Sequence, residues 1–167
     1  ITPIVTDQAD QGPPAVDGDN MVFHDNTDGN LNIYKIDLTT LQKTQITTHS
    51  SDQRSPDIYG DITIWTDNRR TGSYNGSDIY AHNASTGQIK NISDNDFTQR
   101  NSRIYNNIVV WESAEGGETH IYKHDLTSDI TQRITLDGVF AEYPDIYENT
   151  IVWQQWTGST YDIFKLD

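Results

Sequence analysis

Hydrophobic and polar residues alternate in short runs along the chain, and one run recurs four times. Its clearest copy covers residues 56–65, where two apolar stretches flank the turn Tyr59-Gly60-Asp61. The other copies cover residues 14–23, 102–111 and 144–153. Short apolar runs bounded by Gly, Asn and Asp are typical of β-hairpins rather than helices. Each copy is therefore predicted to form two antiparallel strands joined by a tight turn.

Two further short strands are predicted after each hairpin. The first has an aromatic column, Tyr34, Tyr80, Tyr122 and Phe164, in the ranges 32–37, 78–83, 120–125 and 162–167. The second has an isoleucine column, Ile46, Ile92 and Ile134, in the ranges 43–47, 88–93 and 132–135. Each repeat thus holds four strands, called a to d below in chain order. Four antiparallel strands in about 42 residues are typical of one β-propeller blade.

Two columns of large apolar residues explain how such blades would pack. Strand a carries Val16, Ile58, Ile104 and Ile146, and strand b carries Phe23, Trp65, Trp111 and Trp153. A blade in a ring presses both faces on its neighbours, so its strands need not alternate strictly. Because a single blade cannot bury both faces, stability must come from stacking. The tryptophan column is therefore predicted to be core rather than a ligand platform.

The first residues of the chain repeat the pattern of a strand d. Residues 1–11 match residues 43–53, with Ile4 in the place of Ile46, and the chain closes at Asp167 after a strand c. We therefore predict one all-β domain over residues 1–167, a β-propeller with four four-stranded antiparallel blades per chain. The predicted blades cover approximately 14–47, 56–93, 102–135 and 144–167, and the terminal strands 1–6 and 160–167 share the last blade.

Two closures of the ring satisfy this strand count. One chain can close on itself as a four-bladed monomer, which we expect because the strand set is complete. Alternatively, two chains exchange the terminal strand and form an eight-bladed ring with two-fold symmetry. A third interpretation is that the chain is an excised part of a larger propeller.

The repeat resembles that of the TolB-type propellers. The resemblance rests on Pro-Asp-Ile-Tyr-Gly-Asp-x-Ile-x-Trp-x-Asp-Asn-Arg at 56–69, Ser-Asp-Ile-Tyr at 77–80 and Gln-x-x-x-Ile-Ser at 88–93. It covers essentially the whole chain and implies a β-propeller at the cell surface, outside the cell or in the periplasm. The family includes partner-binding scaffolds, accessory domains of peptidases, and polysaccharide lyases. No lyase or peptidase motif matches, so the resemblance implies no catalytic residues. Four blades depart from the family's usual six or seven.

The negative charge of the chain limits the kinds of partner that it can bind. The formal net charge is -14, so nucleic acid and anionic membrane surfaces would be repelled. A cation, a neutral sugar or a basic protein surface fits better. No run approaches the ~18 apolar residues of a membrane helix, and no cysteine is present for a disulfide or a thiolate metal site. The start at Ile1, without Met, favours a processed product or an excised domain.

Oxygen-rich loops suggest a cation site. The loops that join b to c and d to a emerge on one face of a propeller, called the loop face below. Its acidic segment Asp25-Asn26-Thr27-Asp28-Gly29-Asn30 offers the ligands that Ca²⁺ prefers. Asp25, Asp28 and Asp67 are the candidate metal ligands. The alternative is that Asp, Asn and Gly only form β-turns here, since the segment lacks an EF-hand pattern.

A second candidate site combines Arg69, Arg70, Tyr74 and Trp156. The arginine pair and Tyr74 flank or lie in a four-residue insertion of the second repeat, and Trp156 lies outside the tryptophan core column. Arginines and aromatic rings together could clamp a peptide carboxylate or stack on a sugar. The alternative is a solvated loop beside one partly buried tryptophan.

Catalytic patterns are missing from the sequence. It has no Cys, no Gly-x-Ser-x-Gly and no phosphate-binding loop. His120 and His124 share a predicted strand that would separate them by ~13 Å, so they cannot chelate as a helical pair would. The expected function is therefore a non-catalytic module that binds a protein or a glycan or serves as a scaffold. The alternative is a carbohydrate-active enzyme, a lyase or hydrolase, with acidic residues at the propeller axis.

Overall fold

The computed structural model describes residues 1–6, 8–70 and 76–167, and within these ranges the regular structure is entirely β. Fifteen strands form four antiparallel sheets, each built from consecutive strands. The first sheet contains β1 (Ala15–Asp17), β2 (Asn20–Asp25), β3 (Asn32–Asp37) and β4 (Lys43–Gln45). The second contains β5 (Gln53–Tyr59), β6 (Ile62–Asp67), β7 (Asp78–Asn83) and β8 (Gln88–Asn91).

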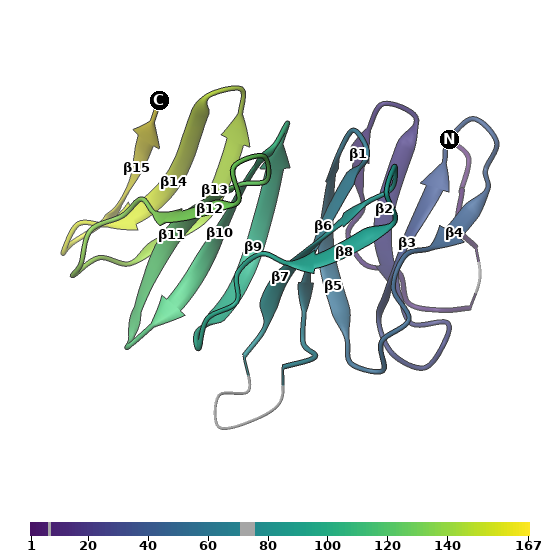
Figure 1. Cartoon of the computed structure of the whole chain (residues 1–167), viewed down its shortest axis with the longest axis horizontal. Coiled ribbons are helices and arrows are strands. Elements are labelled where there is room, and N and C mark those ends of the chain that lie inside the picture. The colour runs from purple at the N-terminus through teal and green to yellow at the C-terminus, as the bar shows by residue number, and fades with distance from the viewer. Residues whose placement is uncertain (7, 71–75) are drawn as a thin grey trace.

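The third and fourth sheets repeat this order. The third contains β9 (Thr98–Tyr105), β10 (Ile108–Glu115), β11 (Glu118–Asp125) and β12 (Ile130–Arg133). The fourth contains only β13 (Ala141–Tyr147), β14 (Thr150–Trp156) and β15 (Tyr161–Leu166). The sheets stand side by side in chain order, and the two termini lie at opposite ends of the row (Figure 1). In the part of the chain that is described, no helix is long and apolar enough to cross a membrane.

The core lies between successive sheets, as the repeat columns predict. Between the second and third sheets, Ile64, Ile79 and Ile92 pack against Ile104, Val109 and Trp111. Between the third and fourth, Val110 and Ile121 pack against Ile146, Ile151 and Trp153. Each sheet therefore has a front face, which meets the preceding sheet, and a back face, which meets the next one. The prediction that the tryptophan column is core is confirmed, since Trp65, Trp111 and Trp153 are all buried.

The predicted strand d is too long in the first two blades, and in the third blade it has the predicted length but lies two residues earlier, since β12 begins at Ile130. The reason lies in one hydroxyl group per blade. Thr47 Oγ1 accepts the backbone N–H of Ile33 at 2.8 Å, and Ser93 Oγ accepts that of Ile79 at 2.7 Å. A side chain thus replaces the backbone ladder at the end of strand d, which is a familiar use of Ser and Thr.

The sharing of the last blade by the two termini is not confirmed. Residues 1–6 contain no strand, and β15 pairs with β14 alone. Val5 packs instead on the first sheet, beside Phe23 and Met21, at the far end of the row from β15 (Figure 1). Two whole sheets separate the termini, so a single chain with this curvature leaves the ring open.

Candidate functional site

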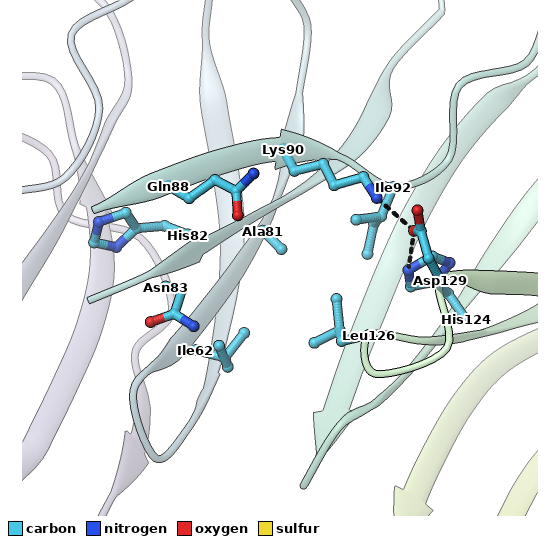
Figure 2. A pocket seen from close by; sticks show the side chains of 10 residues that line it. All are labelled: Ile62, Ala81, His82, Asn83, Gln88, Lys90, Ile92, His124, Leu126 and Asp129. Atoms are coloured by element: carbon cyan, nitrogen blue, oxygen red, sulfur yellow. Dashed lines mark hydrogen bonds and ion pairs between the residues drawn. The ribbon is translucent and has the colours of Figure 1, made fainter. Parts of the chain in front are cut away.

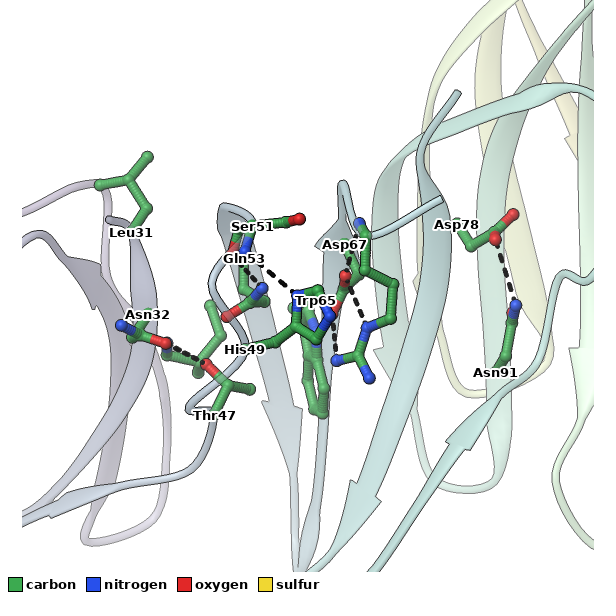
Figure 3. Close-up of polar contacts among 12 residues, drawn as sticks. Leu31, Asn32, Thr47, His49, Ser51, Gln53, Trp65, Asp67, Asp78 and Asn91 are labelled. Carbon is green, nitrogen blue, oxygen red and sulfur yellow. Dashed lines mark hydrogen bonds and ion pairs between the residues drawn. The ribbon is translucent and has the colours of Figure 1, made fainter. Parts of the chain in front are cut away.

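Arg69 forms an ion pair inside the second blade. The carboxylate of Asp67 is fully buried and accepts both Arg69 Nε at 2.9 Å and a terminal guanidinium nitrogen at 2.6 Å. It also accepts Trp65 Nε1 at 2.9 Å (Figure 3). The guanidinium lies 4.3 Å from the Tyr80 ring centre, and its bond to Asp67 raises the pKa of Arg69. Arg69 thus neutralises a buried carboxylate beside the core tryptophan.

Arg70 ties two segments of the loop face together. It bonds Asp78 at 2.5 Å and the backbone oxygens of Phe97, at 3.1 Å, and of Asn95. Asp78 also accepts Asn91 Nδ2 at 3.1 Å (Figure 3). Burial raises the pKa of Asp78 in spite of the nearby guanidinium. Arg70 therefore anchors the segment that leads from the second sheet to the third.

The other members of the predicted arginine and aromatic site lie elsewhere. Tyr74 falls outside the described residues. Trp156 ends β14 in the fourth sheet, where its ring centre is 5.3 Å from that of Tyr161. The whole third sheet stands between Trp156 and the arginines. The structure therefore does not bring Arg69, Arg70 and Trp156 together.

The predicted cation ligands already have protein partners. Asp25 is buried and accepts Lys43 Nζ at 2.8 Å and the Thr27 backbone N–H at 2.7 Å. Burial opposes ionisation of Asp25, but these hydrogen bonds outweigh it and lower its pKa. Asp28 accepts the Tyr34 hydroxyl at 2.7 Å and Gln45 Nε2 at 3.0 Å. Asp25 and Asp28 belong to the first blade and Asp67 to the second, so the three carboxylates do not converge.

A cluster that no sequence pattern predicted lies on strands a and b, called the inner strands below, of the third and fourth blades: β9, β10 and β13. This inner cluster consists of Arg100, Asn101, Glu112, Glu142 and the backbone of Tyr143. Glu112 is almost fully buried and accepts Arg100 Nε, Asn101 Nδ2 and the Tyr143 N–H, each at 2.7 Å. Asn101 and Tyr143 both have positive φ, 53° and 54°, at bulges in strand a. Glu112 thus fixes the bulge of the next blade.

The exposed members of the inner cluster can reach a ligand. Arg100 and Glu142 keep part of their side chains in solvent, and their nearest charged atoms are 4.0 Å apart. Glu142 also accepts Gln154 Nε2 at 3.3 Å. A guanidinium beside a carboxylate can bond the hydroxyl and carboxylate groups of a sugar or a peptide. Because partner choice depends on the tertiary structure, the only sequence signal was that Arg100 and Glu142 align in the repeat.

One further group of metal-ligand residue types meets on the loop face of the third blade. The donor atoms of Glu118, His120 and Asp137 lie within 4.8 Å of one another. His120 Nε2 is 3.1 Å from Glu118, and its Nδ1 is 3.3 Å from the Thr135 hydroxyl. Asp137 pairs with Arg133 at 2.5 Å. These contacts link β11 to the loop after β12. The three side chains thus hold these two segments of the blade together.

A pocket of about 310 Å³ opens between the second and third sheets, at the end opposite the loop face (Figure 2). His82 and His124 line it, and Asp129 pairs there with Lys90 and lies 3.5 Å from His124 Nε2. Pockets of about 230 and 340 Å³ occupy the corresponding places between the other sheets. Because the pocket recurs at each junction, it is a packing groove of the repeat rather than a unique site.

The two histidines of this groove make stability depend on pH. Burial lowers the pKa of His82 and of His124 below the ordinary value of 6.5. Lys35 lowers the pKa of His82 further, whereas Asp129 opposes the shift at His124. The unfolded chain therefore takes up protons at a higher pH than the native protein. The stability that the neutral imidazoles contribute is complete above pH 6.5 and is lost as the pH falls below it.

We expect the melting temperature to fall between pH 7.5 and pH 5.5, by about 2–4 °C for each kcal/mol lost. The double variant H82L/H124L should show a shallower fall, with His24, whose pKa burial also lowers, left to titrate. Leucine is a suitable replacement because Leu166 occupies the equivalent place in β15. Calorimetry at the two pH values measures the slope. An unchanged slope in the variant would contradict the assignment.

Comparisons with known proteins agree on the fold. No protein-family model and no curated protein matches the sequence. TolB from Acinetobacter baumannii superposes with a TM-score of 0.73 at 21% identity, over 98% of this chain and 42% of TolB. The acylaminoacyl peptidase of Pyrococcus horikoshii gives 0.72 at 16% identity, over 93% and 26% of the two chains.

A third structure extends the comparison. The β-propeller domain of the Trilobed protease from Pyrococcus furiosus, described as having an open velcro topology, gives a TM-score of 0.70 at 15% identity, over 95% of this chain and 55% of that domain. The chain thus spans between 26% and 55% of the three proteins. Identities this low establish the fold alone. With its repeated sheets and the core between them, the chain has the β-propeller fold of TolB and of the peptidase propeller domains.

Proposed function

We propose that the chain is a non-catalytic propeller module, located outside the cytoplasm, that binds a protein or a glycan. One observation carries the proposal. The buried carboxylates of the loop face and inner strands, Asp25, Asp67 and Glu112, are each paired with a basic side chain. A carboxylate that acts as a general acid or base must exchange protons with a substrate, whereas these three hold strands and loops in place.

The surface proposed for binding is the solvent side of the inner cluster. Arg100 and Glu142 are partly exposed there, and the neighbouring Tyr143 side chain is exposed. The exposed ring of Tyr143, which follows Glu142 in the chain, would offer a stacking surface, and Arg100 and Glu142 would offer hydrogen bonds, which suits a sugar or a peptide. The rigid strands on each side keep these groups in fixed positions.

A carbohydrate-active enzyme is the second candidate, favoured by the two carboxylates of the inner cluster. Glu112 of β10 bonds Arg100 at 2.7 Å, and Glu142 of β13 lies 4.0 Å from the same guanidinium. Glycoside hydrolysis needs one carboxylic acid and one carboxylate on either side of the scissile bond. Glu112 already accepts three hydrogen bonds, so Glu142 would have to supply the reactive group.

A glycan array combined with a turnover screen on polyuronides separates the two candidates. The proposed function predicts binding without release of new sugar ends, and weaker binding by the E142Q variant. The matched control is E148Q, which changes an exposed glutamate in the turn after β13. Turnover that is lost in E142Q and kept in E148Q would replace the proposal with the enzyme. A protein ligand is sought in parallel by cross-linking, with E142Q as the discriminating variant.

A further inference from the structure

The two ends of the row of sheets expose apolar residues that are buried everywhere else in the repeat. On the back face of the fourth sheet, Ile163 is 78% exposed, whereas the equivalent Ile33, Ile79 and Ile121 are fully buried. On the front face of the first sheet, Val16 is 63% exposed, whereas Ile58, Ile104 and Ile146 are between 5% and 8% exposed. Each end thus lacks the neighbour that covers these positions at the internal junctions.

The two uncovered faces are the two halves of one junction. At the junction of the third and fourth sheets, Ile121 and Val110 of the back face pack in one cluster with Ile146 and Ile151 of the front face. The equivalents of the back-face pair in the fourth sheet are Ile163 and Val152. The equivalents of the front-face pair in the first sheet are Val16 and Met21. The back face of the fourth sheet therefore carries the residues that would pack on the front face of the first sheet, in the same arrangement as at the internal junctions.

Residues 1–6 already occupy half of such a junction. Val5 packs against the cluster of Phe23, Tyr34 and Ile36 on the front face of the first sheet. At the junction of the second and third sheets, Ile92 directly follows β8 and packs with Trp111 and Val109. Ile92 aligns with Ile4, so Val5 makes the corresponding contact from one residue further along the chain. The segment therefore lies where strand d of a preceding blade would lie, with no strand c beside it.

The outer edge of β15 offers the missing strand c. In the first sheet, Ile46 donates its backbone N–H to the Ile33 oxygen at 2.8 Å, so Ile4 would donate to Ile163. N–H directions alternate along a strand, so the position before Ile46 turns its N–H outward. Pro3 aligns with that position, where a missing donor costs nothing on an edge strand. The sequence of the segment thus suits pairing with β15.

We infer that two copies of the chain associate head to tail, with β15 and the back face of the fourth sheet of each copy seated against residues 1–6 and the first sheet of the other. Both faces of both copies are then covered, and four sheets from each copy close a ring with two-fold symmetry. Apolar side chains that lie in water in one chain become core. This inference goes beyond the proposed function, because ring closure does not depend on what the inner cluster binds.

Sedimentation equilibrium of the chain tests the association. We expect a mass of twice the 19.0 kDa of one chain, and the mass of a single chain for the variants I163D and V16D. Both replaced side chains are exposed in one chain, so the variants should fold, as circular dichroism would show. The matched control is I130D, at an exposed isoleucine of β12 away from both ends, which should keep the double mass.

Cross-linking then identifies the faces, since the chain has no cysteine of its own. A mixture of I163C with V16C should give a cross-linked pair of chains under oxidising conditions, and a mixture of I130C with V16C should not. The inference is overturned by a single-chain mass at every concentration, which would leave the faces to other parts of a longer polypeptide. A double mass that survives I163D, or a mass that keeps growing with concentration, would overturn it as well.

Discussion

Replacement of Trp111 by alanine is expected to lower the free energy of unfolding by about 3–5 kcal/mol. The indole is fully buried between the second and third sheets, and it stacks on Tyr122 with ring centres 6.0 Å apart. Its Nε1 donates to Gln99 Oε1 at 2.8 Å, and Gln99 is itself buried. The substitution therefore leaves both a cavity and an unsatisfied amide oxygen. Urea denaturation followed by far-ultraviolet circular dichroism measures the loss.

Trp156 provides the matched control for that measurement. It is also a tryptophan in strand b, but it lies beyond the core column and is partly exposed. The W156A variant should change the free energy of unfolding by about 0.5 kcal/mol. Equal losses for W111A and W156A would contradict the view that stability resides in the junctions between sheets.

Replacement of Asp67 by alanine is expected to cost about 3 kcal/mol, at the lower end of the range for breaking a buried ion pair. The carboxylate is inaccessible to solvent and serves as acceptor for both Arg69 and Trp65 Nε1. Its removal leaves the indole N–H of Trp65 buried without this acceptor. The loss stays at the lower end because Arg69 is partly exposed and can turn toward water. Chemical denaturation of D67A measures the change.

Two variants sharpen the interpretation of D67A. D67N keeps an oxygen acceptor for Trp65 and loses only the charge, so its stability should lie between those of the native protein and D67A. D167A removes an equally simple pair, Lys165 with Asp167, that is exposed on both sides, and solvent screening leaves little to lose there. If D167A were as destabilising as D67A, burial would not be the reason for the cost.

The partners of the charged side chains in the inner cluster and in the loop-face pairs could not be predicted from the sequence. Arg69 and Arg70 are predicted as ligand-binding residues because an arginine pair beside an aromatic ring can clamp a carboxylate or stack on a sugar. The structure gives them Asp67 and Asp78, at the ends of facing strands β6 and β7. Glu112 was one acidic residue among many until the fold placed Arg100 and the Tyr143 backbone beside it.

Local pattern alone determined the hairpins, the core columns and the blade as the repeating unit. Strand alternation, turn residues and the 42-residue spacing are set by neighbours in the chain, so they can be read without knowing the fold. The length of strand d could not be read in this way, because it depends on a hydroxyl such as that of Thr47 bonding a backbone 14 residues away.

The course of the terminal segment and the partners of the charged side chains were decided only by the tertiary structure. The sequence of residues 1–6 resembles strand d, but they form no strand within this chain, because the packing of the sheets determines which strand they can reach. The curvature of the row arises from the packing of whole sheets, and side-chain pairing arises from which loops this packing brings together. The curvature and the side-chain pairing both depend on many contacts between residues that are distant in the chain, so no local sequence pattern predicts them.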